Sequence, residues 1–411
     1  MGTHQAAQPL ERNRVNHLAI LGSTGSIGRQ CLSVVESLPG QFVVCGLAAG
    51  SNLDELVKQI ERHRPNVVSV ADGKKADELV ERLRAKNLAP LPAIHHGRAG
   101  MVTVATLARP EIVVSAAVGV VGLEATYEAV KLGKIVALSN KEVLVAAGEL
   151  VMAAAQKVGR ELLPVDSEHN AVHQCLRGGK AIEVRRLVLT ASGGPFRKTR
   201  LSDFDSITPE QALAHPNWRM GNRISIDSAT MMNKGFEIIE ARWLFGMHPD
   251  QIDVVIHPQS VVHSMVEFVD GSIKAQLGVP DMHLPIAVAL SYPERLEGVT
   301  PAPDLAALGQ LSFEPLDEVR YPAVALAREA GERGGTAPAV LNAANEEAVA
   351  LFLAGQRRFV DIIPSVRAAV EAAPASEELT LEAAIAADRW ARAHVRASAG
   401  GASRLRSKLP A

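Results

Sequence analysis

Cysteine is scarce in this 411-residue sequence, which has only Cys31, Cys45 and Cys175. Their wide spacing excludes a disulfide framework and a paired-cysteine metal site, and it indicates a reducing compartment. No stretch approaches eighteen consecutive apolar residues, and the first fourteen residues lack the apolar core of a signal peptide. These absences predict a cytoplasmic protein that does not span a membrane.

A surplus of either charge is also missing. Lys and Arg number 43 against 45 Asp and Glu, a formal net charge of −2. This balance excludes the basic surface with which proteins bind nucleic acids or anionic membranes. Apolar residues make up 47% of the chain and charged residues 21%, as in ordinary globular proteins, and the length predicts two or three domains.

The first part of the chain alternates short β-type runs with helical periodicity. An example of the latter is the stretch 52–63, where Leu53, Leu56, Val57 and Ile60 recur at helical spacing. This alternation predicts a doubly wound parallel-sheet α/β domain over residues 15–165. Its seven strands are expected at 17–21, 42–48, 66–71, 92–96, 111–117, 134–139 and 160–165.

The pattern changes after residue 180 and predicts an α+β domain over 166–290. Its separate sheet, expected to pair antiparallel and to offer a dimer surface, has a hairpin signal at Asp270-Gly271. A linker is expected over 291–320 and a helical bundle over 321–411. The predicted strands are 185–191, 223–228, 253–258, 260–269 and 272–277, and the predicted helices of the bundle are 321–333, 338–354, 361–373 and 380–398.

Polar segments follow several strands of the predicted parallel sheet, and ligands bind at the carboxyl ends of such strands. The segment "GSTGSIG" (22–28) lies between a strand and a helix, where glycines let backbone N–H groups approach a pyrophosphate; a mere tight turn is the alternative. The second strand ends in "AGSN" (49–52) without an acid to bind a ribose 2′-hydroxyl, which favours NADP.

Carboxylates supply a second candidate site. Asp166 and Glu168 follow the last strand and offer oxygen ligands suited to Mg²⁺ or Mn²⁺, although two solvated surface acids are the alternative. The stretch 224–241 adds Glu237 and Glu240, and Lys234 lies three residues before Glu237. An ion pair on a surface helix would explain that spacing equally well.

Several motifs together resemble the 1-deoxy-D-xylulose 5-phosphate reductoisomerase family. They occur in the family's order over residues 17 to about 360: "GSTGSIG", "ALSNKE", "LLPVDSEHN", "SGGPF", "HPNWRMG", "IDSATMMNKGFEIIEARWLF", "HPQSVVHSMVEFVDGS" and "LNAANE". The resemblance implies an enzyme of non-mevalonate isoprenoid synthesis. It would rearrange 1-deoxy-D-xylulose 5-phosphate and reduce it with NADPH to 2-C-methyl-D-erythritol 4-phosphate. Magnesium, manganese or cobalt would act as the Lewis acid, and the enzyme would form a homodimer.

The resemblance also assigns roles to residues. The implied metal ligands are Asp166, Glu168 and Glu237, and Lys141 and His215 join these three as catalytic residues. The implied substrate-binding residues are Lys141, Ser167, Glu168, Ser192, His215, Trp218, Ser228, Asn233, Lys234 and Glu237. The implied NADPH-binding residues are Thr24, Gly25, Ser26, Ile27, Gly50, Ser51, Asn52, Asn140, Glu142 and Gly221. The segment 214–222 is expected to be a lid in which Trp218 covers the substrate.

Ser51 stands where the family often carries a basic residue, which weakens the expected contact with a 2′-phosphate. Three alternatives stay open. A relative could act on a different branched substrate. A semialdehyde dehydrogenase would need an activated cysteine, and neither Cys31 nor Cys175 has a polar context. A non-catalytic NADP sensor would have no reason to carry the carboxylates.

Overall fold

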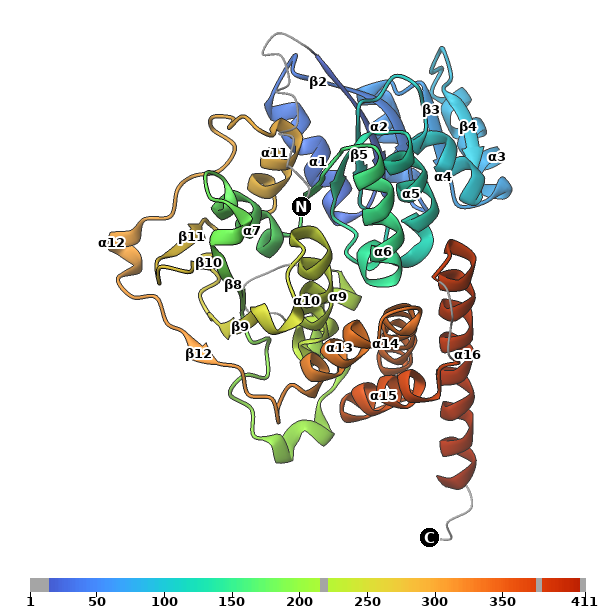
Figure 1. Ribbon diagram of the computed structural model, residues 1–411. Helices are drawn as coiled ribbons and strands as arrows, with labels where there is room; N and C mark the ends of the chain where they lie inside the picture. The colour runs from blue at the N-terminus through green and yellow to red at the C-terminus, as the bar shows by residue number, and fades with distance from the viewer. Residues whose placement is uncertain (1–14, 215–220, 375–378, 407–411) are drawn as a thin grey trace. The chain divides into compact units, whose positions relative to one another are not determined.

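The computed structural model describes residues 15–214, 221–374 and 379–406, with side chains as far as residue 398 (Figure 1). The chain forms two compact units. Within the described residues, the first unit comprises 15–143, 151–173 and 281–302, and the second comprises 144–150, 174–280 and 303–406. The domain boundaries expected from the sequence stay predictions.

The first unit contains a seven-stranded sheet with the order β4-β3-β2-β1-β5-β6-β7, in which all neighbours pair parallel. This confirms the predicted doubly wound sheet. The chain adds β2 to β4 on one side of β1 and β5 to β7 on the other, so the topological switch point lies between β1 and β5. The strands are β1 Asn16–Leu21, β2 Phe42–Ala48, β3 Val67–Val70, β4 Ala93–His96, β5 Ile112–Ser115, β6 Ile135–Leu138 and β7 Leu162–Pro164.

Helices connect these strands (Figure 1). Their apolar sides belong to the same buried core as the strands. The predicted helix at 52–63 is α2, and its stripe of Leu53, Leu56, Val57 and Ile60 is buried. The helices are α1 Ser26–Ser37, α2 Leu53–His63, α3 Gly73–Ala85, α4 Gly97–Ala105, α5 Leu123–Lys131 and α11 His283–Ser291, while α6 Glu142–Lys157 and α7 Ser167–Leu176 each continue into the second unit.

The second unit contains a five-stranded sheet with the order β11-β10-β8-β9-β12. The pairs β10–β11, β10–β8 and β9–β12 are antiparallel as predicted, but β8 and β9 pair parallel. The hairpin at Asp270-Gly271 is confirmed: Gly271 has φ +85° and the Asp270 carboxylate accepts from the Ser272 amide at 2.9 Å. The strands are β8 Val184–Ala191, β9 Ile252–Ile256, β10 Val262–Phe268, β11 Ile273–Leu277 and β12 Glu314–Pro315.

Helices make up the rest of the second unit and confirm the predicted helical C-terminal region. Most of them pack around a core that includes Phe236 and Phe352, whereas the short α12 (Leu305–Leu308) is exposed. Figure 1 shows the arrangement of these helices. The helices are α8 Pro209–Leu213, α9 Asn222–Thr230, α10 Met232–Phe245, α12 Leu305–Leu308, α13 Pro322–Arg333, α14 Ala337–Leu353, α15 Ile362–Ala372 and α16 Leu381–Arg406.

The strand predicted at 223–228 is wrong, because these residues form helix α9. The prediction rested on the alternation of Ile224 and Ile226, and a stretch of about six residues is too short to distinguish a strand from a helix. Arg223 and Asp227, four residues apart, both turn inward and bond polar side chains of α14. Because polar residues take part in the buried face of α9, the apolar residues alone do not show the helical period.

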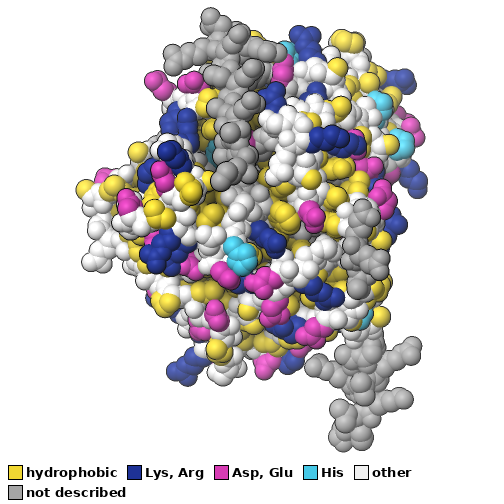
Figure 2. All heavy atoms as spheres, in the orientation of Figure 1, with side chains coloured by type: hydrophobic (Ala, Val, Ile, Leu, Met, Phe, Trp, Pro, Cys, Tyr) yellow, Lys and Arg dark blue, Asp and Glu magenta, His cyan; other side chains and the backbone are white. Residues whose placement is uncertain are grey.

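Acidic and basic side chains are interspersed over the face drawn in Figure 2, in keeping with the formal net charge of −2. None of the helices within the described ranges combines the length and the apolar character needed to cross a membrane.

Candidate functional site

The turn between β1 and α1 requires glycine at two positions. Gly22 has φ +86°, and a Cβ there would lie 2.4 Å from the Ala116 carbonyl oxygen after β5. A Cβ on Gly28 would lie 2.3 Å from the Gly22 carbonyl oxygen. The backbone therefore passes closely between β1, β5 and the first turn of α1. The N-terminus of α1 therefore lies at the switch point, the position where doubly wound dinucleotide-binding folds hold a pyrophosphate.

The segment after β2 carries the residues expected near a 2′-phosphate. Gly50, Ser51 and Asn52 are exposed, and the Asn52 side chain caps α2 by accepting from the Glu55 amide at 3.2 Å. The Gly50 carbonyl accepts from the Ala71 amide at 3.3 Å, which ties this turn to the end of β3. The turn is thus held at both ends while Ser51 faces solvent.

Asn140, after β6, is buried and donates its amide to the Gly119 carbonyl at 2.8 Å, which fastens the loop after β5. The structure thus brings most of the candidate cofactor residues to the carboxyl ends of three strands of the first unit: Thr24, Gly25, Ser26 and Ile27 after β1, Gly50, Ser51 and Asn52 after β2, and Asn140 and Glu142 after β6. The tenth candidate, Gly221, is the N-cap of α9 in the second unit.

Buried Lys141 and partly exposed Asp166 form an ion pair at the ends of β6 and β7. These strands pair parallel with Leu138 opposite Pro164, so the residues just beyond them meet, and Lys141 Nζ lies 2.5 Å from Asp166 Oδ2. Burial by itself would raise the pKa of Asp166. The Lys141 ammonium and the His169 ring outweigh burial and hold that pKa well below its usual range. Asp166 therefore stays ionised at neutral pH.

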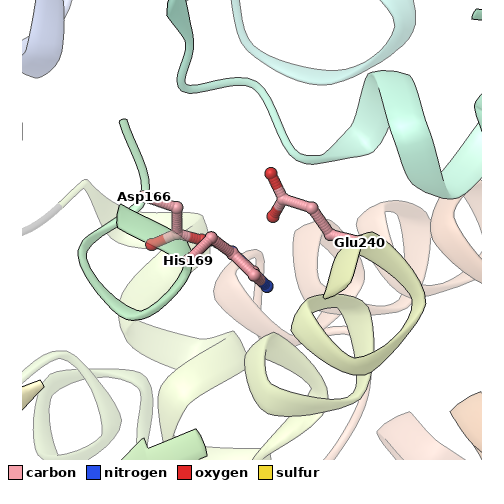
Figure 3. Close-up of side chains that lie close together, drawn as sticks. All are labelled: Asp166, His169 and Glu240. Carbon is pink, nitrogen blue, oxygen red and sulfur yellow. The ribbon is translucent and has the colours of Figure 1, made fainter. Parts of the chain in front are cut away.

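Other residues of the same motif support this turn. Glu168 has a carboxylate oxygen within 4.8 Å of one on Asp166 and accepts from the Ser167 hydroxyl. The fully buried His169 ring places Nδ1 3.7 Å from Asp166 Oδ2. Figure 3 shows the side chains of Asp166 and His169 at the start of α7, and it also draws Glu240 on α10. The buried Asn170 amide donates to the Pro164 and Pro285 carbonyls at 2.8 and 3.2 Å. The motif therefore fixes its own geometry.

Within the second unit, the turn after β8 lies against the end of α9. Gly194 has φ +66°, and a Cβ there would lie 2.8 Å from the Ser228 carbonyl oxygen. The Ser192 hydroxyl accepts from the Gly194 amide at 3.2 Å. Ser192 and half-buried Ser228, both expected to bind substrate, are therefore brought together.

Helix α10 follows α9 directly and carries the remaining candidates. Glu237 is fully buried and accepts from the Asn233 amide and from the Lys234 ammonium, which is itself 3% exposed. The alternative of an ion pair on a surface helix is therefore wrong. Glu240, one turn later, is also fully buried.

Tyr321 is a residue that the sequence interpretation missed. Its buried hydroxyl donates to the Gly193 carbonyl at 2.7 Å and so anchors the turn that carries Ser192. Burial raises the pKa of Tyr321 to about 12, so the hydroxyl keeps its proton. The two residues are 128 positions apart, and no local pattern signals the contact.

His215 and Trp218, and with them most of the expected lid at 214–222, lie outside the described residues. The cysteines are buried, and burial raises the pKa of Cys31 to about 12 and that of Cys175 to about 11. Such thiols stay protonated, which is unfavourable for the nucleophile that a semialdehyde dehydrogenase needs.

Three family models match most of the chain. The model described as 1-deoxy-D-xylulose 5-phosphate reductoisomerase matches residues 18–148. The model of the C-terminal domain of that enzyme matches 162–245, and the model described as the DXP reductoisomerase C-terminal domain matches 277–394.

Individual relatives agree with the models. The chain is 51% identical to the 1-deoxy-D-xylulose 5-phosphate reductoisomerase of Pelotomaculum thermopropionicum, over 92% of this chain and 97% of the relative. It is 54% identical to that of Chlorobium phaeovibrioides, over 91% and 97%.

Two solved structures share the fold. One is DOX-P reductoisomerase in complex with NADPH, fosmidomycin and magnesium, with a TM-score of 0.89 and 39% identity over 94% of this chain and 98% of that one. The other is the Zymomonas mobilis enzyme in complex with NADPH, with a TM-score of 0.86 and 41% identity over 94% and 99%. The chain described here belongs to the 1-deoxy-D-xylulose 5-phosphate reductoisomerase family.

Proposed function

We propose that this protein converts 1-deoxy-D-xylulose 5-phosphate to 2-C-methyl-D-erythritol 4-phosphate by rearrangement and NADPH-dependent reduction. The observation that carries the proposal is the partly exposed Asp166, held ionised by the buried Lys141 beside Glu168 at the carboxyl end of a dinucleotide-type sheet. When bound, NADPH supplies the hydride and a divalent ion supplies a Lewis acid to the ketone oxygen.

The first unit suits NADPH. The glycines of the β1–α1 turn place the N-terminus of α1 at the switch point of the sheet, where a helix N-terminus favours a pyrophosphate. No acid occurs in the turn after β2, so nothing there repels a 2′-phosphate. Two solved relatives were determined in complex with NADPH.

The carboxylates suit a hard divalent cation. Asp166 and Glu168 offer oxygen ligands within 4.8 Å of each other, and we propose that Glu237 of the second unit supplies the third. Carboxylate oxygens favour Mg²⁺ or Mn²⁺, and Co²⁺ is a further candidate. One of the solved relatives contains magnesium.

The polar groups of the second unit suit the phosphate of the substrate. The hydroxyls of Ser192 and Ser228, the Asn233 amide and the Lys234 ammonium offer neutral and charged donors to a dianion. Lys141 would donate to a substrate oxygen next to the metal ligands, and Ser167 would position Glu168.

A relative that acts on a different branched sugar phosphate is the remaining alternative, and one assay separates the two. NADPH oxidation should depend on both 1-deoxy-D-xylulose 5-phosphate and Mg²⁺ or Mn²⁺. Oxidation that does not require the ketose phosphate would contradict the proposed substrate.

We also propose a homodimer in a reducing cytoplasm. The edge strand β11 presents Ile273, which is 56% exposed, and the neighbouring turn presents Val269, which is 66% exposed. An exposed apolar edge is suited to pairing with a second copy.

The proposed compartment rests on the cysteines. The three buried, unpaired cysteines fit a reducing compartment.

Replacing a metal ligand should abolish turnover. Glu237→Gln and Asp166→Asn each remove one negative charge from the cation, and loss of a ligand should lower kcat by about 100-fold or more. NADPH affinity, measured by fluorescence titration, should stay within about twofold because the glycine turn is separate. Full activity of either variant at limiting Mg²⁺ would contradict the three-carboxylate site.

Ser51→Asp should weaken the preference for NADPH over NADH. The new carboxylate would repel a 2′-phosphate and accept from a ribose 2′-hydroxyl, so the ratio of the two kcat/KM values should fall about tenfold. Ser37→Asp, which adds the same charge at the C-terminal end of α1 and outside the turn after β2, is the matched control. An unchanged ratio in Ser51→Asp would mean that the 2′-phosphate does not bind beside the turn after β2.

Gly194→Ala should damage the phosphate site beyond its effect on stability. The Cβ adds the strain of a positive φ, about 1–2 kcal/mol, and also pushes on the Ser228 carbonyl. Gly246→Ala has nearly the same φ, +64°, but open space around the Cβ, so it carries the strain alone. KM for the ketose phosphate should therefore rise in Gly194→Ala and not in Gly246→Ala. Equal KM values would contradict the proposed position of the phosphate.

A further inference from the structure

The segment "LNAANE" (341–346) on α14 has no role in the proposed function, yet it is tied to helix α9. Asn342 and Asn345 are fully buried, and the Glu346 side chain is only 14% exposed. Polar groups in such places need partners, because burying them without hydrogen bonds is costly. Their partners on α9 are Arg223 and Asp227, one helical turn apart.

Arg223 uses all three guanidinium nitrogens in these contacts. Nη1 donates to Glu346 Oε1 at 2.5 Å and Nη2 donates to Asn342 Oδ1 at 2.7 Å. Nε lies 3.3 Å from Asp227 Oδ2 on its own helix. The planar guanidinium therefore fixes the direction of the first turn of α9 relative to α14.

Asp227 supplies the second tie. Its side chain is 5% exposed, and Oδ1 accepts from the buried Asn345 amide at 2.6 Å. A carboxylate buried to this degree depends on both partners, Arg223 and Asn345. Arg223 and Asp227, one helical turn apart, each bond to α14, so α9 can neither slide along α14 nor rotate against it without losing a buried hydrogen bond.

The network continues to the C-terminal helix. Arg392 on α16 donates to Glu346 Oε2 and forms a forked pair with Asp388, at 2.9 Å for both bonds. Glu346 thus joins Arg223 on one side to Arg392 on the other. The long helix α16 supports the same carboxylate that holds α9.

Helix α9 also carries part of the proposed phosphate site. Ser228 follows Asp227 directly, and its carbonyl is the atom that Gly194 approaches. At Met231 the chain turns through a left-handed residue, φ 62°, and enters α10, whose first turn carries Asn233 and Lys234. The position of α9 therefore decides where three of the phosphate-binding candidates lie.

We propose that Glu346 and Asn345 are positioning residues for phosphate binding, acting through Arg223 and Asp227 on the helix that carries Ser228. This inference rests on the proposed function for the identity of the ligand, a sugar phosphate. The helical C-terminal part of the chain thereby contributes to substrate affinity without contacting the substrate.

The matched pair Glu346→Gln and Glu347→Gln tests the proposal in the full-length enzyme with Mg²⁺ and NADPH. Glu347 pairs with Arg396 at 2.8 Å, so both substitutions remove a bond between α14 and α16, but only Glu346 also holds α9. We expect Glu346→Gln to raise KM for the ketose phosphate and the inhibition constant of inorganic phosphate by about tenfold. Its kcat should change far less, and the Kd for NADPH should be unchanged. Glu347→Gln should match the wild type in all four quantities.

Equal KM and inhibition constants in the two variants would overturn the proposal, because the bond to α9 would then be irrelevant. A parallel loss of NADPH affinity in Glu346→Gln would indicate general unfolding of that variant and not a local effect on phosphate binding. If Glu346→Gln does not fold, Arg223→Lys tests the proposal instead. This variant keeps the positive charge but loses the planar guanidinium that donates to both Glu346 and Asn342. An unchanged inhibition constant in Arg223→Lys contradicts the role of the network.

A measurement of phosphate binding that does not depend on enzymatic turnover separates this inference from the proposed function. Inorganic phosphate should raise the midpoint of thermal unfolding of the wild type and of Glu347→Gln, and should raise that of Glu346→Gln clearly less. If the wild type does not act on the ketose phosphate, the proposed function fails while this comparison still stands. If phosphate stabilises all three proteins equally, the positioning role fails.

Discussion

Pairing of buried carboxylates with neighbouring cations is the interaction on which the candidate site depends. Burial favours the protonated acid, so an acid that must stay ionised needs a cation or several donors close by. Asp166 has Lys141, Glu237 has Lys234, and Asp227 has Arg223. Two of these acids are candidate metal ligands and the third holds the helix that carries Ser228. Their charges are therefore kept at defined positions before any ligand arrives.

Backbone geometry places these pairs. Lys141 and Asp166 meet because β6 and β7 run parallel in a fixed register and both end at the same edge of the sheet. At the switch point, the absence of a side chain on Gly22 lets the turn after β1 lie against the loop after β5. Gly194 does the same for the turn after β8 and the end of α9. At these places a methyl group is enough to separate segments that must be in contact.

The helical C-terminal part of the chain is hydrogen-bonded to α9, the helix that carries Ser228, and its sequence does not suggest this contact. Alanine-rich helices usually indicate simple apolar packing, and α14 does contribute many alanines to the core. Yet the same helix presents two asparagines and a glutamate to α9, where they satisfy an arginine and an aspartate. A buried polar network of this kind favours one arrangement of these helices over shifted ones, because a shift would separate buried charges from their partners.

Much of the fold could be predicted from the sequence because its signals are local. The seven strands of the first sheet, helix α2, the hairpin at Asp270-Gly271 and the C-terminal helices follow from periodicity and turn chemistry. The glycine turn and the acids Asp166 and Glu168 could be located as strand-end residues for the same reason. Helix α9, the parallel pairing of β8 with β9, and the bond from Tyr321 to Gly193 could not be predicted. Each depends on residues far apart in the chain, whose burial and hydrogen bonds exist only after the segments have packed together.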